Sequence, residues 1–180
     1  MAKPVGKLAL VFPGQGSQCV GMGYDLYKAS PAARAVFETA DATLGFPLSR
    51  LCFEGPEEEL RDTAIAQPAI VTVGIATLAA LEERLFSRGE TLLPAFVAGH
   101  SVGQYAALVA GGVLTFEEAI RLVGRRGRLM KDAGERQPGG MVAVLALDEA
   151  AVEAVCREAQ AVGVVCPANY NMPGQIVISG

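Results

Sequence analysis

The chain has 180 residues, of which 51% are hydrophobic and 19% charged, with a net charge of -4 at pH 7. This length predicts one domain or slightly more, because domains average about 150 residues. The composition excludes intrinsic disorder and a coiled coil. The acidic balance offers no basic stripe for a phosphate backbone, so no nucleic-acid partner is expected.

Although the mean hydropathy is +0.34, the sequence predicts no membrane span or membrane association. Gly, Pro or charge interrupts each apolar run before the roughly 18 residues that a span requires. The run 8–12 is too short for the apolar region of a signal peptide. The four cysteines have no CxxC spacing and the single histidine gives no metal-ligand set, so no metal is expected. We expect a reduced, cytoplasmic protein, and the sequence sets no oligomeric state.

Apolar runs alternate with helical patterns along the first part of the chain, which predicts an α/β fold. Buried strands are expected at 8–12 and 94–99. Helices are expected from the Ser30 cap to Gly45, at 57–63, at 69–85 behind Pro68, at 104–110 and from the Thr115–Glu118 capping box to about Lys131. A β-α-β-β pattern follows, with strands at 141–147, 163–166 and 175–179 and a helix at 149–160. The change of pattern and the linker candidate 134–140 predict a boundary near 135–140.

The strongest chemical signal is Gly99-His100-Ser101-Val102-Gly103, a G-x-S-x-G pattern between a predicted strand and a predicted helix. This context is typical of a nucleophile elbow, a sharp turn that exposes a strained serine above the sheet. The Val102 amide lies at the helix N-terminus, where a developing negative charge is favoured. The alternative is an ordinary glycine-rich turn in which the serine caps the helix.

A serine needs a base to become a good nucleophile, and the sequence offers no obvious one. Its single histidine, His100, adjoins Ser101, and neighbouring side chains diverge on such a turn. We expect His100 to pack beneath the elbow or to bond to the backbone there.

Two loops give weaker signals. Pro13–Gln18 follows the first strand but carries Cys19 where a dinucleotide fingerprint needs glycine. It could aim a backbone amide at Ser101 or be a tight structural turn. Ala168–Gln175 joins two predicted strands, and alone it supports only a structural role.

Arg126 lies in a predicted apolar stripe of the 115–131 helix, between Val123 and Met130, with Ala119, Leu122 and Leu129 completing the stripe. A guanidinium on such a face is costly without a partner, so it should meet a carboxylate of the protein or of a ligand. A structural ion pair or a side chain that extends to solvent is the other interpretation.

Together these segments resemble the malonyl-CoA:acyl-carrier-protein transacylases, the acyltransferase family of fatty acid and polyketide synthesis. The matching stretches occur in the family's order over nearly the whole chain: Phe12–Gln18, Gln67–Ala69, Gly99–Gly103, Arg126–Gly127 and Asn169–Gln175. The resemblance implies a large hydrolase-like parallel-sheet subdomain with a nucleophile elbow over residues 1–137. It implies the first β-α-β-β part of a small ferredoxin-like subdomain over residues 138–180.

The resemblance also implies a ping-pong acyl transfer without a cofactor, because the coenzyme A thioester is a substrate. Ser101 would take the malonyl group from malonyl-CoA and pass it to the phosphopantetheine thiol of acyl carrier protein. The amides of Gln15 and Val102 would form the oxyanion hole, and Arg126 would pair with the malonyl carboxylate. His100 would support the elbow.

The sequence departs from the family pattern at two places. Most relatives carry glutamate after the elbow glycine, whereas this chain has Gln104. The family's general-base histidine lies beyond the Asn-Tyr-Asn segment, in a part that this sequence lacks. The resemblance therefore implies a truncated transacylase that carries the nucleophile half of the site.

Three alternatives stay open. An acyltransferase domain of a polyketide synthase or multifunctional fatty acid synthase would share these motifs, although a start at Met1 before the first strand favours a stand-alone protein. A serine esterase would share the elbow but would have no use for Arg126. A fragment without the base histidine would be catalytically incompetent and would at most bind acyl carrier protein or coenzyme A.

Overall fold

The computed structural model describes residues 8–180, so Met1 and the interpretation placed on it lie outside the described residues. The chain divides into two compact units, Met1–Asp132 and Ala133–Gly180. Helix α7 (Phe116–Arg136) runs through this division, so the predicted linker 134–140 is helical over its first residues. The division falls a few residues before the predicted boundary at 135–140, and α7 continues beyond the predicted end at Lys131.

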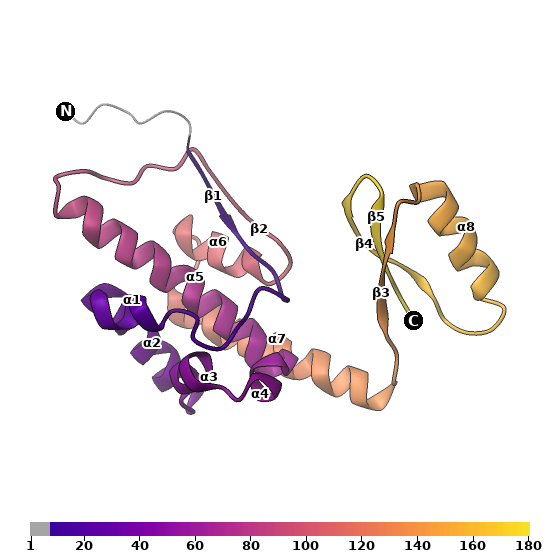
Figure 1. Ribbon diagram of the computed structural model, residues 1–180, viewed down its shortest axis with the longest axis horizontal. Coiled ribbons are helices and arrows are strands. Elements are labelled where there is room, and N and C mark those ends of the chain that lie inside the picture. Colours follow the sequence, from indigo (N-terminus) through magenta and orange to yellow (C-terminus); the bar gives the residue numbers. More distant parts are fainter. Residues whose placement is uncertain (1–7) are drawn as a thin grey trace. The chain divides into compact units, whose positions relative to one another are not determined.

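The first unit contains a small parallel sheet. Strand β1 (Ala9–Phe12) pairs in parallel with β2 (Phe96–Gly99), and Phe12 lies opposite Gly99. Parallel strands need a long crossover connection, and the helices between them supply it (Figure 1). Because both strands run the same way, the loop after β1 and the turn after β2 emerge at the same edge of the sheet.

Among the described residues the first unit also contains seven helices, and two of them, α1 (Tyr24–Ala29) and α3 (Leu48–Glu54), have no counterpart among the predicted elements. Capping residues explain several helix boundaries. At the start of α2 (Pro31–Leu44) the Ser30 side chain accepts from the Ala33 amide, and Gly45 ends that helix with φ 76°. Thr115 and Glu118 form the predicted capping box of α7. The remaining helices are α4 (Glu57–Arg61), α5 (Thr63–Phe86) and α6 (Gly103–Ala110).

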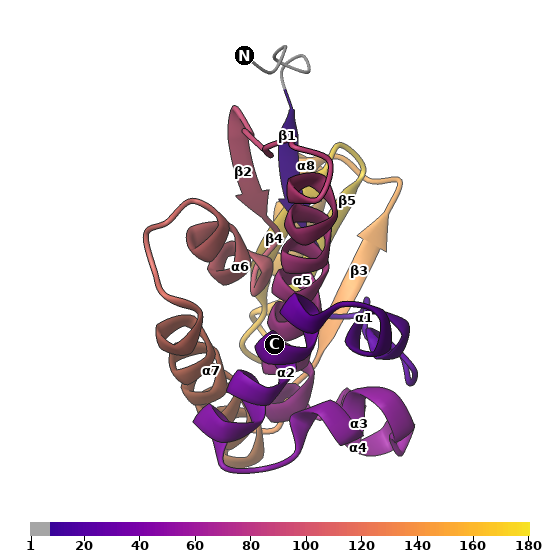
Figure 2. The same ribbon diagram turned by 90° about the vertical axis from the view of Figure 1, so that its left-hand side faces the viewer.

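Helix α5 corrects two predictions. It begins at Thr63, capped by Asp62, and Pro68 lies inside it rather than opening it. Proline removes one backbone hydrogen bond from a helix, but extensive burial of the surrounding turns maintains this one. By length and composition alone α5 could cross a membrane, although Pro68 and Gly74 interrupt its apolar run as predicted. Half of its most apolar window is buried inside the protein, and Figure 2 shows it among the other helices of its unit.

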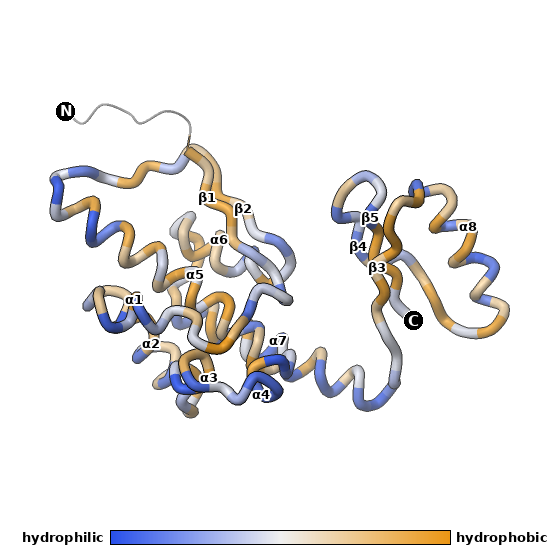
Figure 3. The backbone as a smooth tube through the Cα atoms, viewed as in Figure 1, coloured by the Kyte–Doolittle hydropathy of each residue, from blue (hydrophilic) through white to orange (hydrophobic). Residues whose placement is uncertain are grey.

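The prediction that both strands are buried is also wrong. Phe12 is buried, but Val11 is 74% and Phe96 68% exposed. In the described part of the chain the sheet has only these two strands. Helix α6 contacts both strands and α5 packs on Phe12, but these contacts leave part of the sheet uncovered. Figure 3 shows both strands as strongly hydrophobic segments. An apolar groove lies beside β1, with Val11, Ile70 and Leu78 among its lining residues.

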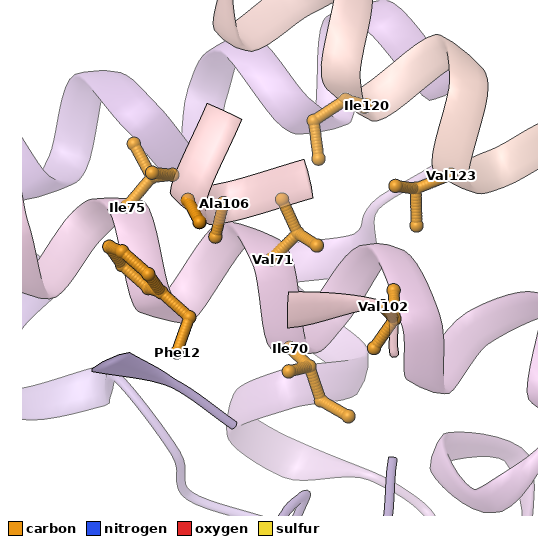
Figure 4. Packing of buried hydrophobic residues seen from close by; sticks show 9 residues of the cluster. Phe12, Ile70, Val71, Ile75, Val102, Ala106, Ile120 and Val123 are labelled. Carbon is orange, nitrogen blue, oxygen red and sulfur yellow. The ribbon is translucent and has the colours of Figure 1, made fainter. Parts of the chain in front are cut away.

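The core of the first unit joins the strand ends to three helices. Phe12 packs against Ile75 and Val71 of α5, and Val102 enters the same cluster from the turn after β2 (Figure 4). Ile120 closes this cluster from α7. A second cluster lies around the fully buried Phe37 of α2 and includes residues of α3, α4 and α5. The loop after β1 and the turn after β2 therefore each adjoin a residue that is buried in this core, Phe12 and Val102.

The second unit has the predicted β-α-β-β order. Strand β3 (Met141–Leu145), helix α8 (Glu149–Ala159), strand β4 (Cys166–Met172) and strand β5 (Gln175–Ser179) form an antiparallel sheet in the order β3-β5-β4. Asp148 caps α8, as predicted, by accepting from the Ala151 amide.

One strand of the second unit was placed wrongly by the sequence pattern. The strand predicted at 163–166 is found at 166–172, so Asn169 and Tyr170 pair with β5 and only Pro173-Gly174 makes the turn. Asparagine is uncommon in strands, which explains the error. Pairing with the apolar β5, whose Ile176 is buried, outweighs this preference.

Candidate active site

Ser101 stands at the sharp turn between β2 and α6. Its φ is 50°, in the left-handed region that residues with a side chain rarely adopt. Strain of this kind costs about 1–3 kcal/mol and persists where surrounding structure enforces it. The buried Val102 side chain on one side and strand β2 on the other supply that enforcement.

The two glycines of the G-x-S-x-G pattern are required by close backbone contacts. A Cβ on Gly99 would lie 2.1 Å from the carbonyl carbon of Gly103. A Cβ on Gly103 would lie 2.5 Å from the carbonyl oxygens of Phe12 and Pro13. Any larger residue would force the turn away from β1. The two glycines therefore allow the serine turn to lie in close contact with the end of the neighbouring strand.

Val102 is the N-cap residue of α6, so its amide lies at the N-terminus of that helix. The next amides already donate within the turn, Gly103 to the His100 carbonyl and Gln104 to the Ser101 carbonyl. In the part of the chain that the structure describes, the Val102 amide donates to no other backbone group. A free amide at a helix N-terminus is suited to a developing oxyanion.

The loop after β1 lies beside this turn. His100 donates its backbone amide to the Phe12 carbonyl at 3.0 Å, and Ser17 Oγ donates to the Gly14 carbonyl at 2.9 Å. The side chain of Gln15 is held from α5, because Thr63 Oγ1 donates to its Oε1 at 3.1 Å. These bonds bring the predicted oxyanion residue Gln15 into the same hydrogen-bonded framework as the elbow.

His100 packs against the same loop. A Cβ on Gly14 would lie 2.4 Å from His100 Nδ1 and 2.9 Å from the His100 carbonyl oxygen. Only glycine leaves room for this side chain, so the ring supports the loop from the elbow side. The His100 ring thus lies against the loop after β1, and its support of the elbow stays a prediction.

Arg126 reaches the serine from α7. Its Nη2 donates to Ser101 Oγ at 3.1 Å, and its Nη1 donates to Gln67 Oε1. Among residues 8–180 these partners are neutral oxygens and no carboxylate forms an ion pair with Arg126. Of the two carboxylate partners considered for Arg126, one from the protein and one from a ligand, the geometry therefore leaves the ligand.

The apolar stripe predicted around Arg126 is partly wrong. Ala119 and Val123 are buried, but Leu122, Leu129 and Met130 are about half exposed. The buried face of α7 instead passes through small residues, Gly124 and Gly127 among them. A helix with glycines on its contact face can approach its neighbour closely. A sequence pattern that counts only large apolar side chains does not detect such a face.

Gly127 shows how close that approach is. A Cβ there would lie 2.8 Å from the Thr63 carbonyl oxygen and 2.9 Å from the Ala64 Cα. The N-terminal turn of α5 therefore lies directly against α7, one residue from Arg126. This contact, rather than an apolar stripe, brings the guanidinium to Gln67 and Ser101.

Gln67 is the residue that reasoning from the sequence assigned no role. It is fully buried, and its Nε2 donates to Thr63 Oγ1 at 2.9 Å. The signal was present, because a buried glutamine beside Pro68 in an apolar helix requires partners. Hydrogen bonds now connect five side chains of the site in one series: Gln15, Thr63, Gln67, Arg126 and Ser101.

The remaining matching stretch, Asn169–Gln175, lies in the second unit. It forms the end of β4, the turn and the start of β5. Tyr170 donates its hydroxyl to Glu153 of α8 at 3.4 Å. Within the second unit, the contacts of the stretch Asn169–Gln175 are those of paired strands and their turn.

The chain is similar in sequence to proteins named malonyl CoA-acyl carrier protein transacylase. The malonyl CoA-acyl carrier protein transacylase of Bacillus subtilis is 47% identical over 97% of this chain and 53% of its own length. That of Escherichia coli K12 is 43% identical over 97% of this chain and 55% of its own. The chain thus spans about half the length of the curated relatives it matches.

Solved structures are similar to the same extent. An acyl-carrier-protein S-malonyltransferase from Bartonella henselae is 43% identical, with a TM-score of 0.86, over 97% of this chain and 55% of that one. A malonyl-transacylase in complex with a type II polyketide synthase acyl carrier protein is 41% identical, with a TM-score of 0.84 and the same coverage. Residues 9–180 match the family described as the acyl transferase domain. The chain belongs to the acyl transferase domain family.

Proposed function

We propose that this chain carries the nucleophile part of a site that transfers a malonyl group from malonyl-CoA to the phosphopantetheine thiol of acyl carrier protein. The observation that carries the proposal is the pairing of Ser101, held at φ 50° on the turn after β2, with Arg126 Nη2 at 3.1 Å. A strained serine suits nucleophilic attack, and a guanidinium suits an acyl group that ends in a carboxylate.

The first half-reaction would begin at Ser101 Oγ. The oxygen attacks the thioester carbonyl, the C–S bond breaks, and the serine proton leaves with coenzyme A as its thiol. The negative charge that develops on the carbonyl oxygen would be held by the amides of Val102 and Gln15. The α6 N-terminus supports this role for Val102, and the bond from Thr63 supports it for the Gln15 loop.

The second half-reaction would return the acyl group. The phosphopantetheine thiol attacks the malonyl-serine ester, its proton passes to Ser101 Oγ, and the serine is regenerated. The names of the relatives and the solved complex with an acyl carrier protein support this acceptor. No cofactor takes part, because the energy of the thioester is conserved in the product.

Arg126 would select the acyl group. Within the described chain its guanidinium bonds to the neutral side chains of Gln67 and Ser101. A malonyl carboxylate would therefore give it an anionic partner that the protein does not supply. An acetyl group would leave that charge without one. A site built to pair a substrate group discriminates strongly against an analogue that lacks it.

We infer a cytoplasmic location for this activity. All four cysteines are free, and Cys19 and Cys166 are exposed. Exposed free thiols are typical of reducing compartments.

The test is an intact-mass spectrum of the purified chain before and after incubation with malonyl-CoA. The expected result is a malonyl adduct in the wild-type chain and none in Ser101→Ala. No adduct on a folded wild-type chain would overturn the proposal. Hydrolysis of a neutral ester, without transfer of an acyl group to carrier protein, would favour a serine esterase instead.

A further inference from the structure

We infer that the hydroxyl of Thr63 is a positioning group for this site: it fixes the orientation of the buried Gln67 amide and so holds Arg126 beside Ser101. The inference rests on the proposed function for its consequence in acyl transfer. Its structural part, the hold on Arg126, stands on hydrogen bonds alone.

Gln67 is the residue that must be oriented. Its side chain is fully buried, and its Oε1 accepts from Arg126 Nη1. Its Nε2 donates to Thr63 Oγ1 at 2.9 Å and approaches Met130 Sδ at 3.3 Å. A side-chain amide has nearly the same shape after a half-turn, so its hydrogen-bond partners decide which end faces which neighbour.

Thr63 decides the orientation because its single proton is already committed. Thr63 Oγ1 donates to Gln15 Oε1 at 3.1 Å, so toward Gln67 it can only accept. The Nε2 end of Gln67 must therefore face Thr63, and the Oε1 end must face the guanidinium. Arginine offers donors only, so a reversed amide would set two donors against each other in a buried place.

The location of Thr63 makes this control direct. It is the first residue of α5, after the Asp62 cap, and its carbonyl oxygen lies against Gly127 of α7. Its backbone is thus fixed at the contact that delivers Arg126. The same hydroxyl also holds the side chain of Gln15, so one group connects the oxyanion loop to the carboxylate-selecting arginine.

Replacing Thr63 by Val removes the hydroxyl and keeps the shape, whereas Thr63→Ser keeps the hydroxyl. The matched control is Thr77→Val, also in α5, because the Thr77 hydroxyl donates only to the Val73 carbonyl of its own helix. All variants are first compared by their unfolding midpoints. Initial rates of ester formation on Ser101 are then measured with malonyl-CoA and with acetyl-CoA.

We expect Thr63→Val to lower the ratio of the malonyl rate to the acetyl rate about tenfold, the effect of weakening one hydrogen bond to a charged group. Thr63→Ser should restore the ratio to within about twofold, and Thr77→Val should leave it unchanged. A role limited to stability would slow both substrates equally. An unchanged ratio in folded Thr63→Val would overturn the inference.

A second measurement needs no acyl transfer. In a side-chain NMR spectrum of the ¹⁵N-labelled chain, assigned by the loss of signals in Arg126→Lys, the guanidinium of Arg126 should give restricted, slowly exchanging signals. These should broaden in Thr63→Val and persist in Thr63→Ser. Identical Arg126 signals in wild type and Thr63→Val would overturn the hold on Arg126. A wild-type chain that forms no malonyl ester would overturn the proposed function, while the NMR comparison would still decide whether Thr63 holds Arg126.

Discussion

Arg126 donates to the hydroxyl oxygen of Ser101 across 3.1 Å, although the two residues are 25 positions apart and belong to different elements. The contact depends on close backbone packing at two glycines. Gly103 lies against the end of β1, and Gly127 lies against the start of α5. A cation beside the serine oxygen stabilises negative charge there. Under the proposed function it would also pair with the carboxylate of an acyl group on that oxygen, so attack and selection would share one side chain.

Replacing Arg126 by Ala should weaken the preference for malonyl over acetyl. Charge-assisted hydrogen bonds contribute about 1.5–3 kcal/mol, so the ratio of ester-formation rates should fall by roughly 10- to 100-fold. The measurement is the rate of Ser101 adduct formation by intact mass with each thioester. Arg125→Ala removes an exposed arginine from the same turn of α7 and serves as the control. Equal preference in Arg126→Ala and the parent chain would contradict this role.

Ser101 should be a site where function and stability conflict. Its φ of 50° costs a residue with a side chain about 1 kcal/mol that glycine does not lose. Ser101→Gly and Ser101→Ala both remove the proposed nucleophile and the contact with Arg126, but only glycine relieves the backbone. In urea unfolding Ser101→Gly should therefore be more stable than Ser101→Ala by roughly 1 kcal/mol. Equal stability of the two variants would show that the turn is not strained.

Gly127→Ala should destabilise the first unit and disturb the site together. The added Cβ would meet backbone atoms of Thr63 and Ala64 at 2.8 and 2.9 Å, which cannot give way as a flexible side chain would. Overpacking of this kind costs about 1–3 kcal/mol. Gly134→Ala, in the same helix but with no atom within 4 Å, should be neutral or stabilising. The two variants are compared by their free energy of unfolding, and equal values would contradict the close approach.

The features of the fold and of the candidate site that the sequence predicts correctly are those set by residues close together in the chain. Caps and turns were local: Ser30, Gly45, the Thr115–Glu118 box and the Asp148 cap all occur where their patterns predict them. The elbow was also predicted, because Gly99 and Gly103 bracket a serine between an apolar run and a helical pattern. The sequence could not reveal that Gly103 faces the backbone of Phe12 and Pro13, because these residues lie far away in the chain.

The errors arose where tertiary contacts override local preference. Pro68 suggests a helix start, yet the Asp62 cap and the buried surface of α5 carry the helix through it. Large apolar residues suggested one face of α7, whereas the buried face is built around Gly124 and Gly127. Gln67 has no role that the sequence could assign, because a buried amide is explained only by its partners, and its guanidinium partner Arg126 lies 59 residues away.

Asp62 should make the junction of α5 and α7 sensitive to acid. The hydrogen bond from the Lys131 ammonium, followed by that from the Ala64 amide, holds the pKa of the Asp62 carboxyl below its usual value. A carboxyl whose pKa is lower in the folded state stabilises the fold above its unfolded pKa, about 3.9. That stabilisation is lost as the pH falls below this value and through the folded pKa.

Asp62→Asn keeps an N-cap acceptor but removes the charge, so it isolates the ion pair with Lys131. Because both side chains are partly exposed, the pair should contribute less than about 1 kcal/mol at pH 6. The difference in unfolding free energy between wild type and Asp62→Asn should shrink as the pH is lowered from 6 to 3. Asp62→Ala should lose about 1 kcal/mol more than Asp62→Asn throughout this range, because it also removes the cap. A difference between wild type and Asp62→Asn that stays constant from pH 6 to pH 3 would mean that the Asp62 charge does not stabilise this junction.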